Sequence, residues 1–267
     1  MRNSLKLYLR YLGISIRSQM QYRASFVMLS LGTFLTTAAE YVGVVALFDR
    51  FGSLRGWTLA EVALFYGITN IAFALSEAWA RGFDTFAGMV KSGEFDRVLL
   101  RPRSTALQVA GQELQLMRVG RMAQGLFVLL WSATALNIPW TLGRIALLMA
   151  AILGGACLFS GLFVLQATLC FWTIDSIEVA NTLTYGGVEA ARFPLTIYRD
   201  WFRRFFTFGV PFACVTYFPA LAILGRQDPL GTSLWFQSLA PLIGFAFLLV
   251  ALRVWQFGVR HYRSTGS

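Results

Sequence analysis

Charged side chains are scarce in this sequence, and long hydrophobic runs take their place. Asp, Glu, Lys and Arg make up 13% of the 267 residues, hydrophobic residues make up 57%, and the mean hydropathy is +0.59. A soluble domain of average composition carries about 25% charged residues. So low a charged fraction leaves too little polar surface to cover a water-soluble globule. The composition therefore excludes an ordinary soluble domain and predicts a chain surrounded by lipid.

Histidine, lysine and cysteine are also rare, which excludes several kinds of chemistry. The single histidine, His261, rules out the zinc-protease pattern H-E-x-x-H and argues against a Ser–His catalytic pair. Neither Lys6 nor Lys91 follows a glycine, so the sequence lacks the nucleotide-binding loop G-x-x-x-x-G-K-S/T. The three cysteines fall within hydrophobic runs, where cysteine is a typical packing residue. We therefore expect no catalytic residue, no metal ligand and no bound cofactor in this chain.

Six hydrophobic runs are long enough to be transmembrane helices. A helix needs about 20 mostly apolar residues to cross a bilayer, and these runs lack the alternation of barrel strands. The fold class predicted is an all-α polytopic membrane protein, with a single transmembrane domain over residues 1–267. Pro211 and Pro219 predict a kink or a break in the fifth run. The six runs are Ala24–Phe48, Leu59–Trp79, Met122–Ile138, Ile145–Trp172, Phe202–Leu224 and Leu234–Trp255.

Basic residues gather on one side of this predicted topology. If the N-terminus is inside, the inner segments hold 19 of the Lys and Arg residues and the outer segments hold 4. This bias follows the positive-inside rule and predicts that both termini are cytoplasmic. It also accounts for the net charge of +10, so we expect no nucleic-acid partner.

The N-terminal segment, residues 1–23, is predicted to be an amphipathic helix at the membrane surface. Leu5, Leu9 and Leu12 fall at helical spacing, while the basic side chains fall mostly between them. The helix is interpreted either as an interfacial anchor or as a lever that joins the first hydrophobic run to a cytoplasmic partner.

A polar insert, residues 80–121, is the larger of two predicted inner loops; the other covers residues 173–201. Its apolar residues have helical spacing, Ser92 and Gly93 interrupt the helix, and a second short helix ends before Pro102. A simple connection would be shorter, and this loop carries the aromatic and arginine side chains typical of interfaces. We interpret it as a docking site for a cytoplasmic protein, or alternatively as a loop held in the headgroup layer. The candidate docking residues are Glu94, Phe95, Asp96, Arg97, Arg101, Pro102 and Arg103.

Polar side chains within the hydrophobic runs are candidates for a substrate pathway, because ionisable groups in a bilayer are costly. Glu40 lies about 24 Å along the first run from Ala24, at 1.5 Å per residue. It either contacts a polar or cationic substrate or pairs with an arginine of the outer loops. Asn70 and Gln166 are the other pathway candidates, although both are also typical of helix–helix hydrogen bonds. The outer-loop arginines are Arg50, Arg55 and Arg144.

Two stretches of the sequence resemble the ABC-2-type transporter permeases, in particular a six-span bacterial subgroup. One is SGEFDRVLLRPRS, within the insert. The other is RFPLTIYRDWFRRFFTFGVPFACVTYFPALAILGR, where a Pro-x-x-Ile-Tyr-x-x-Trp run leads to Tyr-x-Pro and Leu-Gly. The six runs and the N-terminal helix are also similar, so the resemblance covers essentially the whole chain.

The resemblance implies an exporter half that works in the bacterial inner membrane, among membrane lipids. Two permease chains, identical or related, would pair, and a cytoplasmic ABC ATPase that binds ATP and Mg²⁺ would attach to each. Residues 94–103 would then couple the ATPase to the helices, with Asp175 and Glu178 as a second contact. Two other functions stay open. An ion-gradient-driven secondary transporter would need midplane carboxylates and internal repeats. A non-transporting membrane scaffold would need the docking loop alone.

Overall fold

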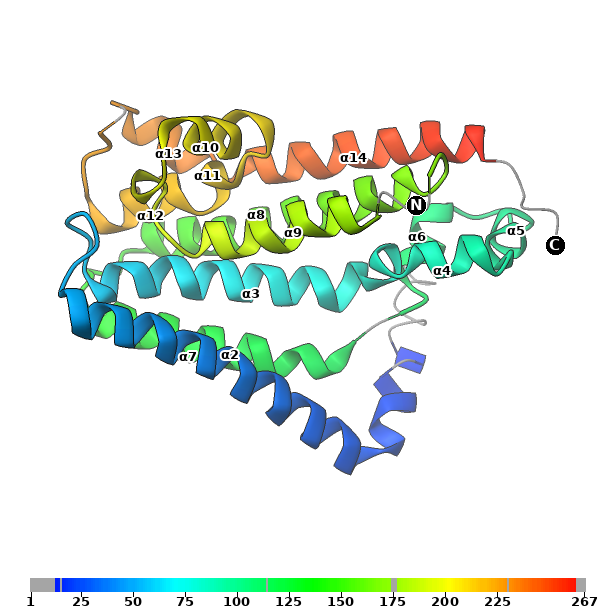
Figure 1. Ribbon diagram of the computed structural model, residues 1–267, viewed down its shortest axis with the longest axis horizontal. Coiled ribbons are helices and arrows are strands. Elements are labelled where there is room, and N and C mark those ends of the chain that lie inside the picture. The colour runs from blue at the N-terminus through cyan, green and yellow to red at the C-terminus, as the bar shows by residue number, and fades with distance from the viewer. Residues whose placement is uncertain (1–12, 15, 114, 174–176, 230, 263–267) are drawn as a thin grey trace.

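The structure is a helical bundle. This computed structural model describes residues 13–14, 16–113, 115–173, 177–229 and 231–262, with the backbone alone at residues 116 and 177–180. Within those ranges the regular elements are helices, apart from an isolated bridge between Leu54 and Trp57. Figure 1 shows the long helices side by side along the long axis of the molecule. We call its two ends the Trp57 end, which carries the loop before α3 (Leu59–Asp84), and the α5 end, which carries α5 (Glu94–Leu99).

Helix α3 is the most deeply buried element of the bundle. It begins with a capping box, in which the Thr58 hydroxyl accepts from the Glu61 N–H and the Glu61 carboxylate accepts from the Thr58 N–H. Every residue from Val62 to Ala74 is buried, so the helix is surrounded by protein over this length. Its main neighbours are α7 (Val119–Ala135) and α8 (Leu142–Leu169), and α8 in turn packs against α14 (Leu242–His261).

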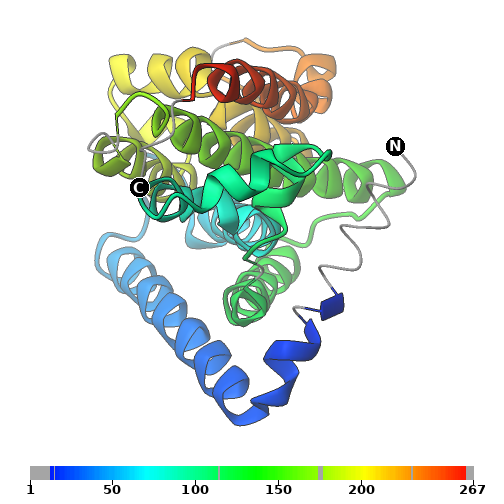
Figure 2. The same ribbon diagram turned by 90° about the vertical axis from the view of Figure 1, so that its right-hand side faces the viewer.

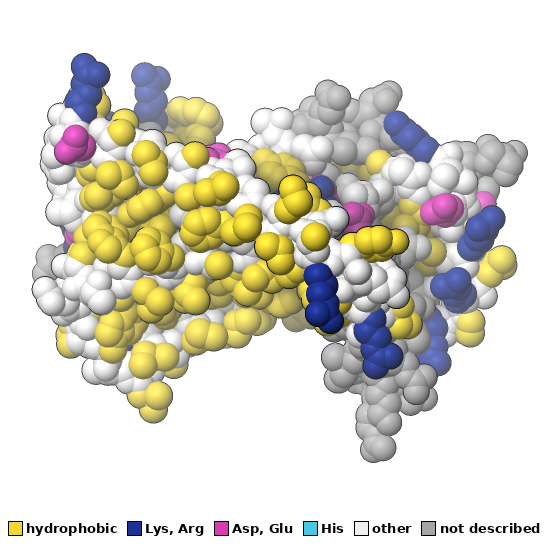
Figure 3. Space-filling model, turned by 90° about the horizontal axis from the view of Figure 1, so that it is seen from below, with side chains coloured by type: hydrophobic (Ala, Val, Ile, Leu, Met, Phe, Trp, Pro, Cys, Tyr) yellow, Lys and Arg dark blue, Asp and Glu magenta, His cyan; other side chains and the backbone are white. Residues whose placement is uncertain are grey.

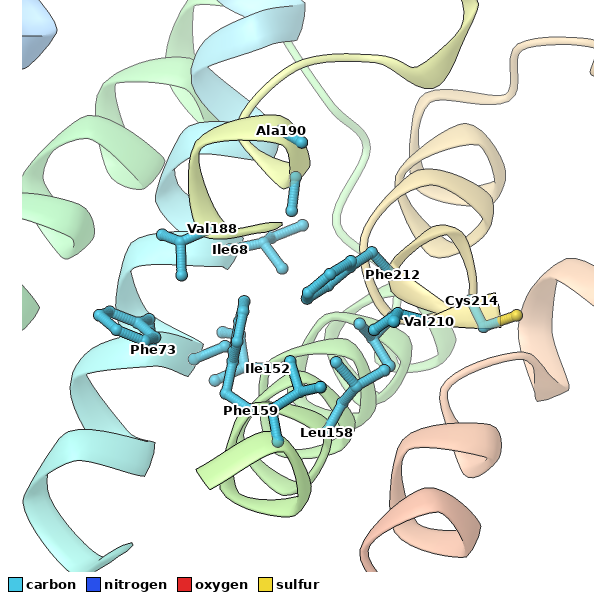
Figure 4. Close-up of a cluster of buried hydrophobic side chains, with 14 of the residues drawn as sticks. Ile68, Phe73, Ile152, Leu158, Phe159, Val188, Ala190, Val210, Phe212 and Cys214 are labelled. Carbon is cyan, nitrogen blue, oxygen red and sulfur yellow. The ribbon is translucent and has the colours of Figure 1, made fainter. Parts of the chain in front are cut away.

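Aromatic side chains join α3 and α8 to elements much later in the chain. Phe159 of α8 lies between Phe73 of α3 and Phe212 of α11 (Phe212–Val215), with ring centroids 5.2 and 5.4 Å away. Figure 4 shows this cluster, which Val188 of α9 (Ile177–Ala191) also enters. The apolar core therefore fixes α9 and α11 against the central helices.

Helix α2 (Arg23–Phe51) lies largely outside this core. Two of its residues, Thr37 and Phe48, are buried, although its composition is as apolar as that of a membrane span. It contacts α3 through the Tyr66 hydroxyl, which donates to the Thr37 carbonyl at 2.9 Å, and it packs against α7, where the Ser30 carbonyl lies close to Gly120. Figures 1 and 2 show α2 at the edge of the bundle. Seen from below, apolar side chains fill the middle of the surface and charged ones gather at its ends (Figure 3). Such a surface suits lipid or another apolar protein surface.

Helix α9 corrects the prediction that residues 173–201 form an inner loop. Near its start, Asn181 accepts a hydrogen bond from Gln166, close to the end of α8. Beyond its last residue, Thr196 accepts hydrogen bonds from the Trp57 indole (2.8 Å) and the Arg55 guanidinium (3.1 Å). The segment therefore runs from the α5 end to the Trp57 end instead of lying at one end.

The fifth predicted span, Phe202–Leu224, is not one straight helix. The chain bends by 73° at the break before Pro211, which confirms a break at this proline. Pro219 lies in the first turn of its helix, where its missing N–H costs little. These pieces occupy the half of the molecule nearest the Trp57 end (Figure 1). They are α10 (Asp200–Arg204), the π-helix η3 (Phe205–Gly209), α11, and α12 (Tyr217–Leu224).

The described residues define an all-α polytopic membrane protein. Four helical segments are long and apolar enough to cross a membrane, or five if the bent pair formed by Asp200–Gly209 and Phe212–Leu224 is counted as one span. The predicted third run corresponds to α7, and the sixth to the short α13 (Leu234–Leu239) followed by α14. The four segments are Arg23–Phe51, Leu59–Lys91, Leu142–Leu169 and Leu242–His261.

The polar insert forms three short helices after α3. The predicted interruption is present: Gly93 has a φ of 70°, which glycine adopts easily, and α5 ends before Pro102. The 3₁₀ turn η1 (Leu116–Arg118) then leads into α7. The helices are α4 (Phe86–Lys91), α5, and α6 (Thr105–Ala110). Of the predicted N-terminal helix, residues 13–14 and 16–21 are helical, and residues 1–12 and 15 lie outside the described part of the chain.

Candidate functional site

The insert folds into a cap over the α5 end of the bundle, which we call the α4–α6 cap (residues 86–110). Phe95 is fully buried, and its ring meets those of Phe86 and Tyr262 edge-on, at centroid distances of 4.9 and 5.0 Å. Phe171 and Trp255 lie against the same ring. This burial contradicts the docking position predicted for Phe95: the side chain fastens the cap to the ends of α8 and α14.

The remaining docking candidates lie on the outside of the cap. Leu100, which the sequence places among them, is 84% exposed, an unusual position for a leucine surrounded by charges. The cap therefore offers a partner an apolar tip with charges of both signs around it. The exposed candidates are Glu94, Arg97, Arg101, Pro102 and Arg103, and the half-buried one is Asp96.

The second predicted contact is not described at the level of side chains. Asp175 lies outside the described residues, and Glu178 belongs to the first turn of α9, where the backbone alone is described. Their role stays a prediction.

A buried carboxylate lies beneath the cap. Glu77 of α3 is 1% exposed and is surrounded by three guanidinium groups, those of Arg118 (3.1 Å), Arg121 (3.3 Å) and Arg81 (3.7 Å). Burial lowers the pKa of Arg118 and the Glu77 carboxylate opposes this, so the guanidinium stays charged near neutral pH. We call these four residues the Glu77 cluster; it ties α3 to η1 and α7.

Asp84 extends the Glu77 cluster to α8 and α9. It pairs with Arg81, accepts from the Gln166 amide at 3.2 Å and accepts from the Tyr185 hydroxyl at 3.3 Å. Gln166, predicted as a pathway residue, also donates to Asn181 at 2.7 Å. The structure therefore gives Gln166 a role in joining helices.

A second polar cluster surrounds the guanidinium of Arg192, nearer the middle of the helices than the Glu77 cluster. Arg192 follows the last residue of α9, and its side chain is 4% exposed. It pairs with Glu40 of α2 (3.0 Å) and Glu189 of α9 (2.6 Å), donates to Asn70 of α3 (3.0 Å), and lies 5.0 Å from the centre of the Tyr66 ring. We call these five residues the Arg192 cluster. Glu40 thus pairs with an arginine, but not with the outer-loop arginines that the sequence suggested.

The Arg192 cluster lies about midway along the helices. Glu40 and Asn70 are each eleven residues from the Trp57 end of their helix, or about 16 Å at 1.5 Å per residue. Yet the side chains of Glu40 and Glu189 are 40% and 62% exposed. A charged side chain that faces lipid at the bilayer centre costs about 2.5–3.5 kcal/mol on insertion scales. We therefore expect this surface to face water or another protein instead of lipid.

Glu40 and Asn70 were predicted as candidate site residues from the sequence, but Arg192, which bonds to both of them, was not. Arg192 was placed in an inner loop because residues 177–201 contain too many polar groups to be read as a hydrophobic run. Its one visible signal is the pair Glu189 and Arg192, three residues apart, which helices bring together. Arg118 and Arg121 were likewise counted as loop charges, since their buried partner Glu77 is distant in sequence.

A bundle of long apolar helices that contains two ion-paired clusters and carries a polar cap at one end is a polytopic membrane protein. The comparison of sequences narrows this class. Residues 34–266 match the family described as ABC-2 family transporter protein, and the chain belongs to that family. It is thus a permease of the ABC transporter class, as the two sequence stretches predicted. No curated protein and no solved structure matches the chain.

Proposed function

We propose that this chain is one half of an ATP-driven exporter in the bacterial inner membrane, with a separate ATPase as its motor. The observation that carries the proposal is the α4–α6 cap, a polar structure that aromatic side chains hold on an apolar bundle. The sequence also has no nucleotide-binding loop, so an ATP-driven function needs a separate ATPase. Six crossings would be made by α2, α3, α7, α8, α9 with the segment after it, and α14. Helices α10 to α13 would enter the membrane from the Trp57 end and return.

The distribution of basic residues supports a cytoplasmic α5 end. Four arginines that were counted in the inner group of 19 follow α9 toward the Trp57 end, which leaves 15 basic residues in that group. The other 8 of the 23 Lys and Arg residues then belong to the opposite side or to the interior. The four arginines are Arg192, Arg199, Arg203 and Arg204. The bias still has the sign of the positive-inside rule.

The Glu77 cluster supports a mechanical link between the cap and the helices. The Thr85 hydroxyl, at the junction of α3 and α4, donates to Glu113 at 2.8 Å, and Arg118 bonds to the neighbouring Gln115. A push on the cap would therefore act on α3 and α7 together, because a packed and ion-paired core moves as a unit. We propose that nucleotide-driven motion of the ATPase enters the bundle here.

The Arg192 cluster is the candidate for the substrate pathway. Its two carboxylates and one guanidinium sum to one negative charge, exposed between α2 and α9 at mid-depth. A second permease chain that covers this surface would enclose it away from lipid, which removes the cost of the exposed carboxylates. The surplus negative charge would favour a cationic or polar cargo.

The proposal is tested by capture of the partner ATPase with the full-length permease. Glu94→Ala, Asp96→Ala and Arg101→Glu are expected to weaken capture while leaving thermal unfolding of the permease unchanged, because these side chains lie on or near the cap surface. Phe95→Ala is the contrast: removal of a buried ring costs about 3–5 kcal/mol and should lower stability. Undiminished capture by all three surface variants would refute docking at the cap. A captured complex that does not respond to ATP would favour a non-transporting scaffold, whereas vanadate-sensitive ATP hydrolysis in liposomes would favour the exporter.

A further inference from the structure

A cavity between the cap and the bundle forms a second site, separate from both clusters. Its volume is about 560 Å³, within the roughly 300–1,000 Å³ of small-molecule pockets. Residues of α3, α6, α8 and α14 line it, so it opens where the cap meets the hydrophobic helices. Its wall includes the apolar side chains of Trp79, Phe83, Val164, Leu252 and Trp255.

The wall of the cavity is apolar because its tryptophans have already used their N–H groups. The Trp79 indole donates to the Ser160 hydroxyl at 2.6 Å, and the Trp255 indole donates to the Thr105 hydroxyl at 3.0 Å. What the indoles present to the cavity is hydrocarbon, with aliphatic side chains beside it. An aliphatic chain would replace water there at a gain proportional to the buried apolar area.

One basic side chain lies at the rim. Arg103 lines the cavity, is exposed, and forms no ion pair with any other residue in the described part of the chain. Ser104 and Gln256 add polar groups beside the same opening. Trp255 is six residues before His261, where α14 ends, which is about 9 Å along the helix. If α14 ends at the cytoplasmic membrane surface, Trp255 lies at the boundary between the lipid headgroups and the acyl chains.

We propose that this cavity binds an anionic phospholipid of the surrounding bilayer. One acyl chain fills the cavity and the phosphate pairs with Arg103. The charge at the rim and the hydrocarbon inside match the two parts of such a molecule, and basic pockets between helices on the cytoplasmic side are a known lipid-binding form. Because α6 supplies one wall, the bound lipid would brace the cap against α14. The site rests on the cytoplasmic α5 end of the proposed function, but it requires neither an ATPase nor a transported substrate, so lipid binding and ATPase capture can fail separately.

Quenching of tryptophan fluorescence by brominated lipid tests the proposal. The permease is reconstituted in phosphatidylcholine vesicles with increasing fractions of phosphatidylglycerol that carries brominated acyl chains. Of the eight tryptophans, the two in the cavity are isolated by comparing the wild type with Trp79→Phe/Trp255→Phe, which keeps an aromatic ring at each position. The wild type should show additional quenching that saturates at a low fraction of brominated phosphatidylglycerol.

The Arg103 variants decide the role of the headgroup. One basic residue near an anionic surface contributes about 1 kcal/mol, so Arg103→Ala should require about fivefold more brominated phosphatidylglycerol for half-quenching. Arg103→Lys should recover most of the loss, and Arg260→Ala, which removes an exposed arginine of α14 outside the cavity, should behave as wild type. Equal quenching by brominated phosphatidylcholine, or no shift in Arg103→Ala, would overturn the proposal. The Arg103 titration keeps both tryptophans, so it is decisive even if the tryptophan variant fails to fold.

Discussion

Arg192 shows how a single buried charge organises three helices. Its guanidinium contacts a residue from each of α2, α3 and α9, and its cost of burial is offset by two carboxylates and an amide oxygen. Glu40 is the only partner on α2, the helix that otherwise lies outside the core. The ion pair therefore adds a charged link between α2 and the bundle to the packing of α2 against α7, where Gly120 lies close to the Ser30 carbonyl.

Removal of Arg192 is expected to destabilise the permease. Arg192→Met would leave the buried Asn70 amide oxygen and the two partly exposed carboxylates without their donor, and loss of hydrogen bonds to a charged group costs about 1.5–3 kcal/mol. Arg199→Met is the matched control, because it makes the same change at an exposed position seven residues later. Thermal unfolding in detergent measures both variants. A similar melting temperature for the two would contradict a structural role for Arg192.

Neutralisation of Glu40 is expected to affect cargo by charge. Glu40→Gln keeps the shape of the side chain but leaves the Arg192 cluster with no net charge. Export of a cationic substrate from vesicles should fall by up to about fivefold, the equivalent of roughly 1 kcal/mol for one partly exposed charge pair. Export of a neutral substrate should change little. An equal loss for both substrates would indicate damage to the fold instead of a change in selectivity.

At the level of helices, hydropathy predicts those elements that are surrounded by lipid or by an apolar core alone. Helices α2, α3 and α8 were predicted to within a few residues over most of their length, and so was the interrupted cap. Helix α9 was missed because Asn181, Tyr185 and Glu189 lower its hydropathy, while protein neighbours satisfy the polar groups. Hydropathy reports apolar surroundings and not direction, so residues 202–224 were predicted as one kinked or broken span, and the size of the bend, 73°, was not predictable.

Close contact between α8 and α14 depends on glycine. A Cβ on Gly244 would lie 2.0 Å from the Gly154 carbonyl oxygen, a backbone atom that has no room to move away. Gly244→Ala should therefore cost about 1–3 kcal/mol, in the range of overpacked cores. Gly43→Ala, at a helical position with nothing within 4 Å, should be neutral or slightly stabilising. The difference in melting temperature between the two variants tests this; equal stability would mean that the helices can separate without cost.

At the level of the whole molecule, two kinds of surface are exposed on the described residues. In its most apolar window α2 is 11% buried, against 78% for the segment that contains α3, and mid-depth carboxylates are exposed beside it. A second permease chain and an ATPase would cover these two kinds of surface, the α2–α9 side and the cap. The docking role of the insert was predicted from its residue pattern, whereas the α2–α9 side could not be, because the exposure of its carboxylates depends on how distant segments pack.

The proposed function requires the α4–α6 cap to face the cytoplasm, where an ATPase can bind it. Leu100→Cys on the cap and Ser53→Cys at the Trp57 end, each in a chain whose three natural cysteines are replaced by alanine, report the two sides in intact cells. A membrane-impermeant maleimide should label Ser53→Cys directly and Leu100→Cys only after the membrane is opened. Direct labelling of Leu100→Cys from outside would contradict the account.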